Sequence, residues 1–117
     1  MDDQRTIDAL SALAQPTRLD AFRRLVAAEP EGIAAGELAS LLAVPQNTLS
    51  AHLAILARAG LATSERRGRS VIYRAGMETL REMLRFLVKD CCGGSPEVCT
   101  PLSVDLAPCN PPARAMP

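Results

Sequence analysis

Large apolar residues recur every three or four positions through the first half of the chain, the pattern of helices that each bury one face. This spacing predicts helices over residues 4–14, 16–28, 34–44 and 45–60. The residues that share a face in the first helix, or are expected to point inward in the second and third, are Ile7, Leu10, Ala14, Leu19, Phe22, Val26, Leu38, Leu41 and Leu42. Because aromatic residues make up only 3% of the chain, the core is expected to consist of small, closely packed helices.

The pattern changes after Gly60, a glycine suited to the left-handed backbone that ends many helices. Residues 61–75 contain two short segments on either side of Gly68, the second rich in β-branched and aromatic residues. We expect two antiparallel strands joined by a tight turn at this glycine. Helical spacing then returns over residues 77–90, where the apolar positions are Leu80, Met83, Leu84, Leu87 and Val88.

Composition divides the chain near residue 90. Residues 1–90 are expected to form one folded domain, whereas residues 91–117 contain six prolines and two glycines and can neither continue a helix nor build a core. All four cysteines lie in this tail, at positions 91, 92, 99 and 109. With no signal-peptide pattern and no run of about 18 apolar residues, we expect a cytoplasmic protein without a membrane span.

The order of elements is that of a mainly α winged helix-turn-helix fold, α-α-α-α-β-β-α. The formal net charge is zero, but residues 45–75 contain five arginines against one glutamate, a local charge of +4. A basic stretch around a predicted recognition helix indicates binding to double-stranded DNA. Polar side chains at the start of this helix would meet base edges, and arginines at the hairpin tip would meet phosphates or the minor groove. The candidate DNA contacts are Gln46, Asn47, Thr48, Ser50, His52, Arg66, Arg67 and Arg69.

His52 fits a second interpretation equally well, as a buried and hydrogen-bonded core histidine. The other polar residues would, taken singly, also fit an ordinary solvated face. Their occurrence together, in the order helix, turn, helix and basic hairpin, favours the DNA-binding interpretation.

Three segments resemble the ArsR/SmtB family of metal-responsive winged-helix repressors: ALAQPTRLDAFRRL, GELASLLAVPQNTLSAHLAILARAGLA and RRGRSVIYRA. The resemblance covers about residues 5–88 and is most specific from Gln46 to Leu61. It implies a homodimer, paired through the first and last helices, that blocks transcription until an inducer releases it from its operator. A twofold dimer in turn predicts an inverted-repeat operator. The apolar residues left over for such an interface are Ile7, Leu10, Leu80, Leu84 and Leu87.

Two sensor sites common in that family have no counterpart in this sequence. The C-x-C position before the recognition helix reads Ala39 and Ser40, and the last helix contains no histidine, since His52 is the only one in the chain. The cysteine-rich tail is therefore the candidate sensor.

Cys91 and Cys92 directly follow the last predicted helix, and the two glycines after them would let the chain reverse so that Cys99 converges on the pair. Thiolates are soft ligands, and trivalent arsenic favours three of them in a pyramid without a fourth ligand. We therefore expect these three cysteines to bind As(III) as the inducer, with Sb(III) or methylarsenite as related inducers and Cys109 outside the site. Some family members are likewise thought to bind arsenite through C-terminal cysteines. No organic cofactor is expected.

Other uses of the same cysteines remain open at this point. A four-thiolate site that includes Cys109 would suit zinc or cadmium, although structural zinc sites usually contain C-x₂₋₄-C pairs, which this sequence lacks. A disulfide between Cys99 and one of the adjacent pair would make a redox switch, and the cysteines could be incidental to a disordered tail. A thiol-dependent arsenic-handling enzyme or a metal-delivery protein fits less well, because there is no C-x-x-C motif or βαβ pattern and neither needs a recognition helix.

Overall fold

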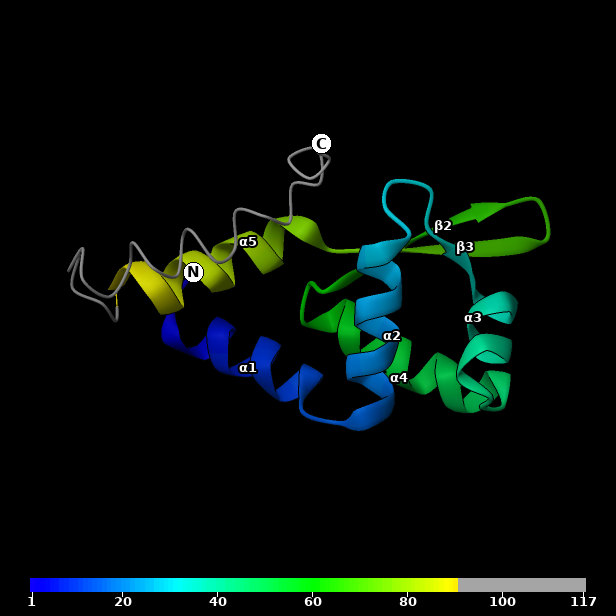
Figure 1. Cartoon of the computed structure of the whole chain (residues 1–117), viewed down its shortest axis with the longest axis horizontal. Coiled ribbons are helices and arrows are strands. Elements are labelled where there is room, and N and C mark those ends of the chain that lie inside the picture. The colour runs from blue at the N-terminus through cyan, green and yellow to red at the C-terminus, as the bar shows by residue number, and fades with distance from the viewer. Residues whose placement is uncertain (91–117) are drawn as a thin grey trace, which may run out of the picture. The chain divides into compact units, whose positions relative to one another are not determined.

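The computed structural model describes residues 1–90, and Figure 1 shows the arrangement of its elements. The helices are α1 (Asp3–Leu13), α2 (Pro16–Ala27), α3 (Ala35–Leu42), α4 (Gln46–Arg58) and α5 (Met77–Arg85), followed by the π-helical segment η1 (Phe86–Asp90). The strands are β1 (Ile33–Ala34), β2 (Ala62–Arg67) and β3 (Ser70–Ala75). Residues 1–83 form the first compact unit, and the second begins at Leu84. The predicted order of four helices, a hairpin and a last helix is confirmed.

The fully buried large side chains in the core of the first unit are leucines from four segments: α2, α3, α4 and the turn after α4. They are Leu25, Leu38, Leu49, Leu53, Leu56 and Leu61. Three of these are the residues of α4 that its helical spacing places on one face. This helix is therefore held in the middle of the fold, in contact with α1, α2, α3 and β2.

Small residues form the buried face of α1, and α2 and α3 each bury one alanine beside larger apolar side chains. Ala9, Ala12 and Ala21 are buried, whereas Leu19 and Leu41 are 45% and 49% exposed. The prediction that these two leucines point inward is therefore wrong. Val26 and Leu42, which were also expected to point inward, are only half-buried. Small side chains allow close approach between helices, so the alanine face turns inward and the neighbouring leucine is left at the rim.

The sheet has three antiparallel strands in the order β1-β3-β2. The predicted hairpin is confirmed, with Arg67 opposite Ser70 at its tip and Gly68 at a φ of 61°. A positive φ is costly for residues with a Cβ, which explains why a glycine begins the two-residue turn. The two-residue strand β1 was not predicted, because so short a segment carries no alternation of its own.

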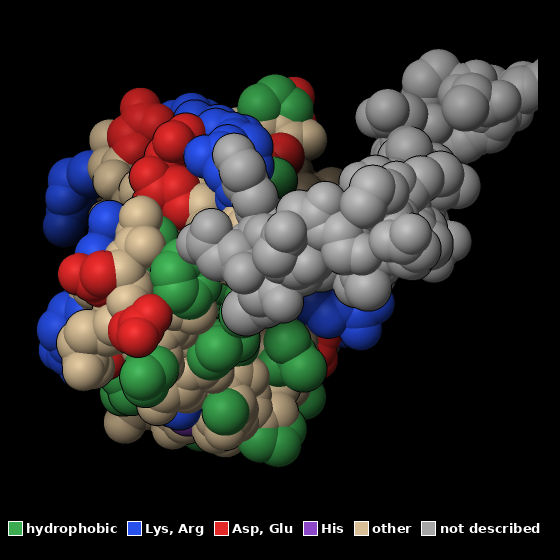
Figure 2. Space-filling model, turned by 90° about the vertical axis from the view of Figure 1, so that its left-hand side faces the viewer, with side chains coloured by type: hydrophobic (Ala, Val, Ile, Leu, Met, Phe, Trp, Pro, Cys, Tyr) green, Lys and Arg blue, Asp and Glu red, His purple; other side chains and the backbone are tan. Residues whose placement is uncertain are grey.

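The first helix exposes large apolar residues to solvent. Ile7 and Leu10 on α1 are 57% and 42% exposed. Figure 2, which views the molecule from the left-hand side of Figure 1, shows hydrophobic side chains at the surface. Within residues 1–90, no helix combines the length and apolar character that crossing a bilayer would need.

Candidate nucleic-acid interface

A helix-turn-helix is formed by α3, the turn at residues 43–45 and α4. The turn begins at Ala43, which has a left-handed backbone with φ 58°, and the N–H of Val44 donates to the carbonyl of Ala39 over 3.1 Å. These contacts satisfy carbonyls at the end of α3 and reverse the chain sharply. Pro45 then precedes α4 in an extended conformation, as its fixed φ favours. The break that the sequence predicts between the two helices is confirmed.

The first turn of α4 presents its polar side chains to solvent. Four of the residues predicted to contact DNA are exposed there: Gln46, Asn47, Thr48 and Ser50. The side chain of Asn47 accepts a hydrogen bond from the N–H of Thr48 over 2.9 Å, which covers one of the unpaired donors at the helix start. The opposite face of α4 is held by buried leucines, so these polar groups project from a rigid support.

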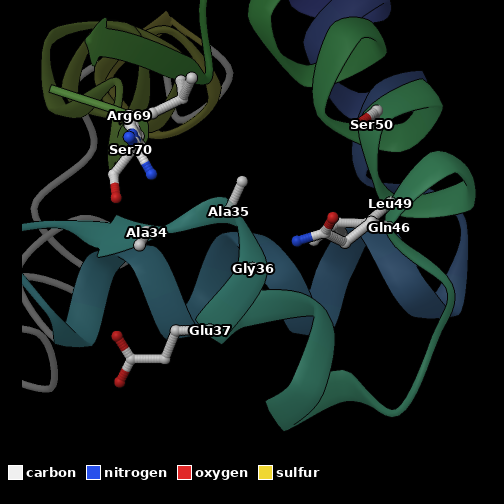
Figure 3. Close-up of a pocket in the computed structure, with 10 residues that line it drawn as sticks. Ala34, Ala35, Gly36, Glu37, Gln46, Leu49, Ser50, Arg69 and Ser70 are labelled. Carbon is white, nitrogen blue, oxygen red and sulfur yellow. The ribbon is translucent and has the colours of Figure 1, made fainter. Parts of the chain in front are cut away.

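A groove of about 470 Å³ separates this first turn from the hairpin β2–β3, which we call the wing. Gln46 and Ser50 line it from α4, Arg69 and Ser70 line it from the wing, and Gly36 lies at the start of α3. Figure 3 shows the Gln46 side chain pointing from α4 toward α3. A Cβ at Gly36 would lie 2.7 Å from its Nε2 atom, so glycine at this position leaves the space that the amide occupies.

The three predicted arginines of the wing differ in their pairing. Arg67 lies 3.3 Å from the carboxylate of Glu65, and both side chains are more than half exposed, so this ion pair is weak. Arg66 and Arg69 have no ion-pair partner in the described part of the chain. These two guanidiniums are therefore available to an anionic ligand such as a phosphate.

A fourth arginine of the wing is engaged elsewhere. Arg74, on β3, donates a hydrogen bond of 3.0 Å to Glu29, which follows α2. This hydrogen bond, and then the charge of the same carboxylate, raise the pKa of Arg74 above its ordinary value. Arg74 counted toward the local charge of +4 in the sequence, but its charge ties the wing to the body of the domain. The basic character of the wing is thus concentrated toward its tip.

His52 lies two turns into α4, half-buried, and does not share the exposure of the first turn. Its Nδ1 atom lies 3.3 Å from Nη1 of Arg18 on α2. The ring has the hydrogen-bond partner that the second interpretation expected, but it is half-buried and does not lie in the core. The partnership with Arg18 had no signal in the sequence, because 34 residues separate the two positions.

The cysteines predicted to bind the inducer, Cys91, Cys92 and Cys99, lie outside the described residues, as does Cys109. At the α3 position of the C-x-C pair that the resemblance in sequence would imply, Ala39 is buried and Ser40 is exposed. In the part of the chain that the structure describes, no three histidine, cysteine or acidic side chains come together as metal ligands would.

Comparisons with known proteins match the part of the chain that contains the helix-turn-helix. Residues 13–65 match the model of a helix-turn-helix domain. The HTH-type transcriptional repressor SmtB of Mycobacterium tuberculosis is 42% identical over 67 residues, which are 57% of this chain and 47% of that protein. The chain thus spans about half the length of this curated relative.

Two solved structures extend the similarity across the fold. The transcriptional regulator HlyU of Vibrio vulnificus is 32% identical, with a TM-score of 0.56 over 69% of this chain and 81% of that one. The homodimeric winged helix-turn-helix DNA-binding domain Mb0332 of Mycobacterium bovis, a possible ArsR-family regulator, is 25% identical. Its TM-score is 0.60 over 75% of this chain and 85% of that one.

Proposed function

Because this chain belongs to the ArsR/SmtB family of winged helix-turn-helix transcriptional regulators, we propose that it is a cytoplasmic, homodimeric repressor released from operator DNA by trivalent arsenic. One observation carries the DNA-binding part of this proposal. The exposed polar turn of α4 and the wing flank one groove, and Arg66 and Arg69 of the wing have no ion-pair partner among the described residues. Base edges and flanking phosphates of one duplex therefore have matching groups on adjacent elements.

The operator of a twofold dimer is an inverted repeat with half-sites about 34 Å, one helical turn, apart or a multiple of that distance. Selection of binding sites from random duplexes, followed by anisotropy titration, tests this part. We expect the selected sites to be palindromic, with an affinity that falls as salt rises. Selection of no sequence, or of single half-sites by a monomer, would contradict the proposal.

The inducer is inferred from the chemistry of the tail. Three thiols that replace the three hydroxyl groups of arsenous acid form three As–S bonds and release three molecules of water. Cys91, Cys92 and Cys99 supply three such thiols, and thiolates prefer soft ions of this kind. The described residues offer no competing cluster of histidine, cysteine and acidic side chains.

Release from DNA requires that arsenic bind the DNA-free form more tightly than the DNA-bound form. By thermodynamic linkage, the factor by which arsenic lowers DNA affinity is the factor by which DNA lowers arsenic affinity. In the sequence, the adjacent cysteines follow η1 directly, and α5 and η1 precede them as one helical segment. Arsenic binding at the end of this helical segment would alter the dimer interface that the family places on the last helix.

A release titration tests the inducer. Arsenite, methylarsenite, antimonite, cadmium and zinc are added in parallel to the protein–operator complex. We expect Cys91→Ser, Cys92→Ser and Cys99→Ser to bind the operator as the parent does but to remain bound with arsenite. Cys109→Ser is the matched control and should respond normally.

The same titration separates the competing inducers. If arsenite still releases the Cys99→Ser variant, which keeps the adjacent pair, the three-thiolate site is wrong. That result would indicate a two-thiolate site suited to methylated arsenic. Release by zinc or cadmium but not by arsenite, with dependence on Cys109, would favour a four-thiolate metal site. Release by an oxidant that reductant reverses, with no response to arsenite, would indicate a disulfide switch.

A further inference from the structure

Arg18 joins three helices through one side chain. It is the third residue of α2, and its Nε atom donates to the carbonyl oxygen of Ala12 in the last turn of α1 over 2.6 Å. Its Nη1 atom lies 3.3 Å from Nδ1 of His52 in α4. Its backbone N–H donates to the side chain of Gln15 over 2.8 Å, which fixes the start of α2 and hence the origin of the arginine side chain.

The chemistry of the pair fixes the role of each partner. A guanidinium has donors only, so in this contact Arg18 donates and Nδ1 of His52 accepts. A hydrogen bond from a charged donor is stronger than one between neutral groups. The imidazole of His52 is therefore oriented by Arg18, with Nδ1 turned toward α2.

The contact with α1 is favourable for a separate reason. The last carbonyls of a helix lack partners within the helix, and a positive charge near them is stabilising. Arg18 supplies both the donor and the charge at Ala12. The same helix, α1, exposes Ile7 and Leu10, the apolar residues expected at the dimer interface. One arginine thus connects the expected dimer helix to the candidate recognition helix.

We propose that Arg18 and His52 are positioning residues that set the orientation of α4 relative to α1, and that His52 acts through Arg18 without touching DNA. This inference rests on the proposed DNA-binding function. In a dimer, the spacing of two recognition helices must match the groove repeat of about 34 Å, so a small rotation of α4 against α1 removes contacts at both half-sites together.

Two substitutions of the histidine separate this role from a direct DNA contact. In His52→Asn the amide Oδ1 replaces Nδ1 as the acceptor for Arg18, while the ε nitrogen is lost. In His52→Leu both are lost, although leucine is the better helix former. We expect the asparagine variant to bind the operator within about threefold of the parent, and the leucine variant to bind at least about tenfold more weakly, as loss of a hydrogen bond to a charged group implies.

Arg18→Met is the partner substitution, since it keeps most of the aliphatic stem. We expect it to weaken operator binding as His52→Leu does, and the double variant to bind no more weakly than the worse single variant, because both remove one interaction. The slope of log affinity against log salt should stay at the parent value, because no phosphate contact is lost. Arg23→Met is the matched control. Arg23 is exposed on the same helix and has no ion-pair partner among the residues described.

Each contrary result has a definite meaning. Equal weakening by the asparagine and leucine variants would show that the ε nitrogen contacts DNA. A slope reduced by about 0.9 per lost contact would make Arg18 a phosphate ligand, and additive losses would remove the coupling. If operator binding weakens only because the melting temperature falls or the dimer dissociates, the pair stabilises the fold and does not set the orientation of α4. Failure of the parent protein itself to bind any duplex would instead refute the proposed function.

Discussion

Removal of the two unpaired arginines of the wing, Arg66→Ala with Arg69→Ala, should reduce the dependence of DNA affinity on salt and leave the fold intact. Both side chains are exposed and neither has an ion-pair partner in the described residues, so no internal interaction is lost. Each phosphate contact contributes about 0.9 to the slope of log affinity against log salt. Two arginines in each protomer of a dimer therefore contribute about 3.6, if all four reach phosphates.

This change of slope is large enough to measure directly. Between about 50 and about 200 mM salt, the affinity ratio of parent to variant should shrink by about two orders of magnitude, since the parent loses affinity faster. The assay is anisotropy of a labelled operator at four or five salt concentrations. The melting temperature and the dimer dissociation constant should remain those of the parent.

A control removes one arginine of each protomer outside the wing. Arg81 on α5 is exposed, donates a hydrogen bond of 2.6 Å to Glu78 and is not part of the wing. Arg81→Ala should leave the slope unchanged. A double wing variant with the parent slope, or an Arg81 variant with an equal loss, would refute the assignment of the wing as a phosphate-binding element.

Three further outcomes follow from the packing. Gly36→Ala should displace the amide of Gln46, since the new Cβ would lie 2.7 Å from its Nε2. The variant should therefore change base preference in a binding-site selection. Gly76→Ala should cost about 2 kcal/mol or more in denaturant unfolding, because its Cβ would overlap a backbone carbonyl oxygen that follows α4. Leu10→Glu should give monomers in sedimentation with an intact fold, whereas Leu41→Glu, at a similarly exposed leucine, should leave the dimer unchanged.

The recognition helix and the wing could be predicted from the sequence because their determinants are local. Leu49, Leu53 and Leu56 repeat at helical spacing and are all buried, and Gly60 ends the helical segment at a φ of 82°. Gly68 likewise occupies the turn position that needs a positive φ. Each of these features depends on neighbours within a few residues, which a pattern along the chain contains.

The orientation of α2 and α3 could not be predicted by the same rule, because apolar size is a poor guide in an alanine-rich chain. A helix face made of alanines lets two helix axes approach closely, and the gain in contacts can exceed that from burying one larger side chain. Leu19 and Leu41 lie outside, whereas Ala21 and Ala39 on the same two helices are buried. The ion pair of Arg74 with Glu29 was equally invisible, because it depends on where the chain returns after 45 residues.

The same property of the core bears on assembly. Ala9 and Ala12 turn inward on α1, so Ile7 and Leu10 remain at its surface. Covering such large apolar side chains with a second surface lowers the free energy of the system in water. Because the alanines of α1 are buried, its larger apolar side chains remain exposed and can contact a partner. Arg18 donates to the carbonyl of Ala12 at the end of this helix and contacts His52 on α4. A shift of α1 in the expected dimer would therefore move the recognition helix through Arg18, without any change in the core leucines that hold it.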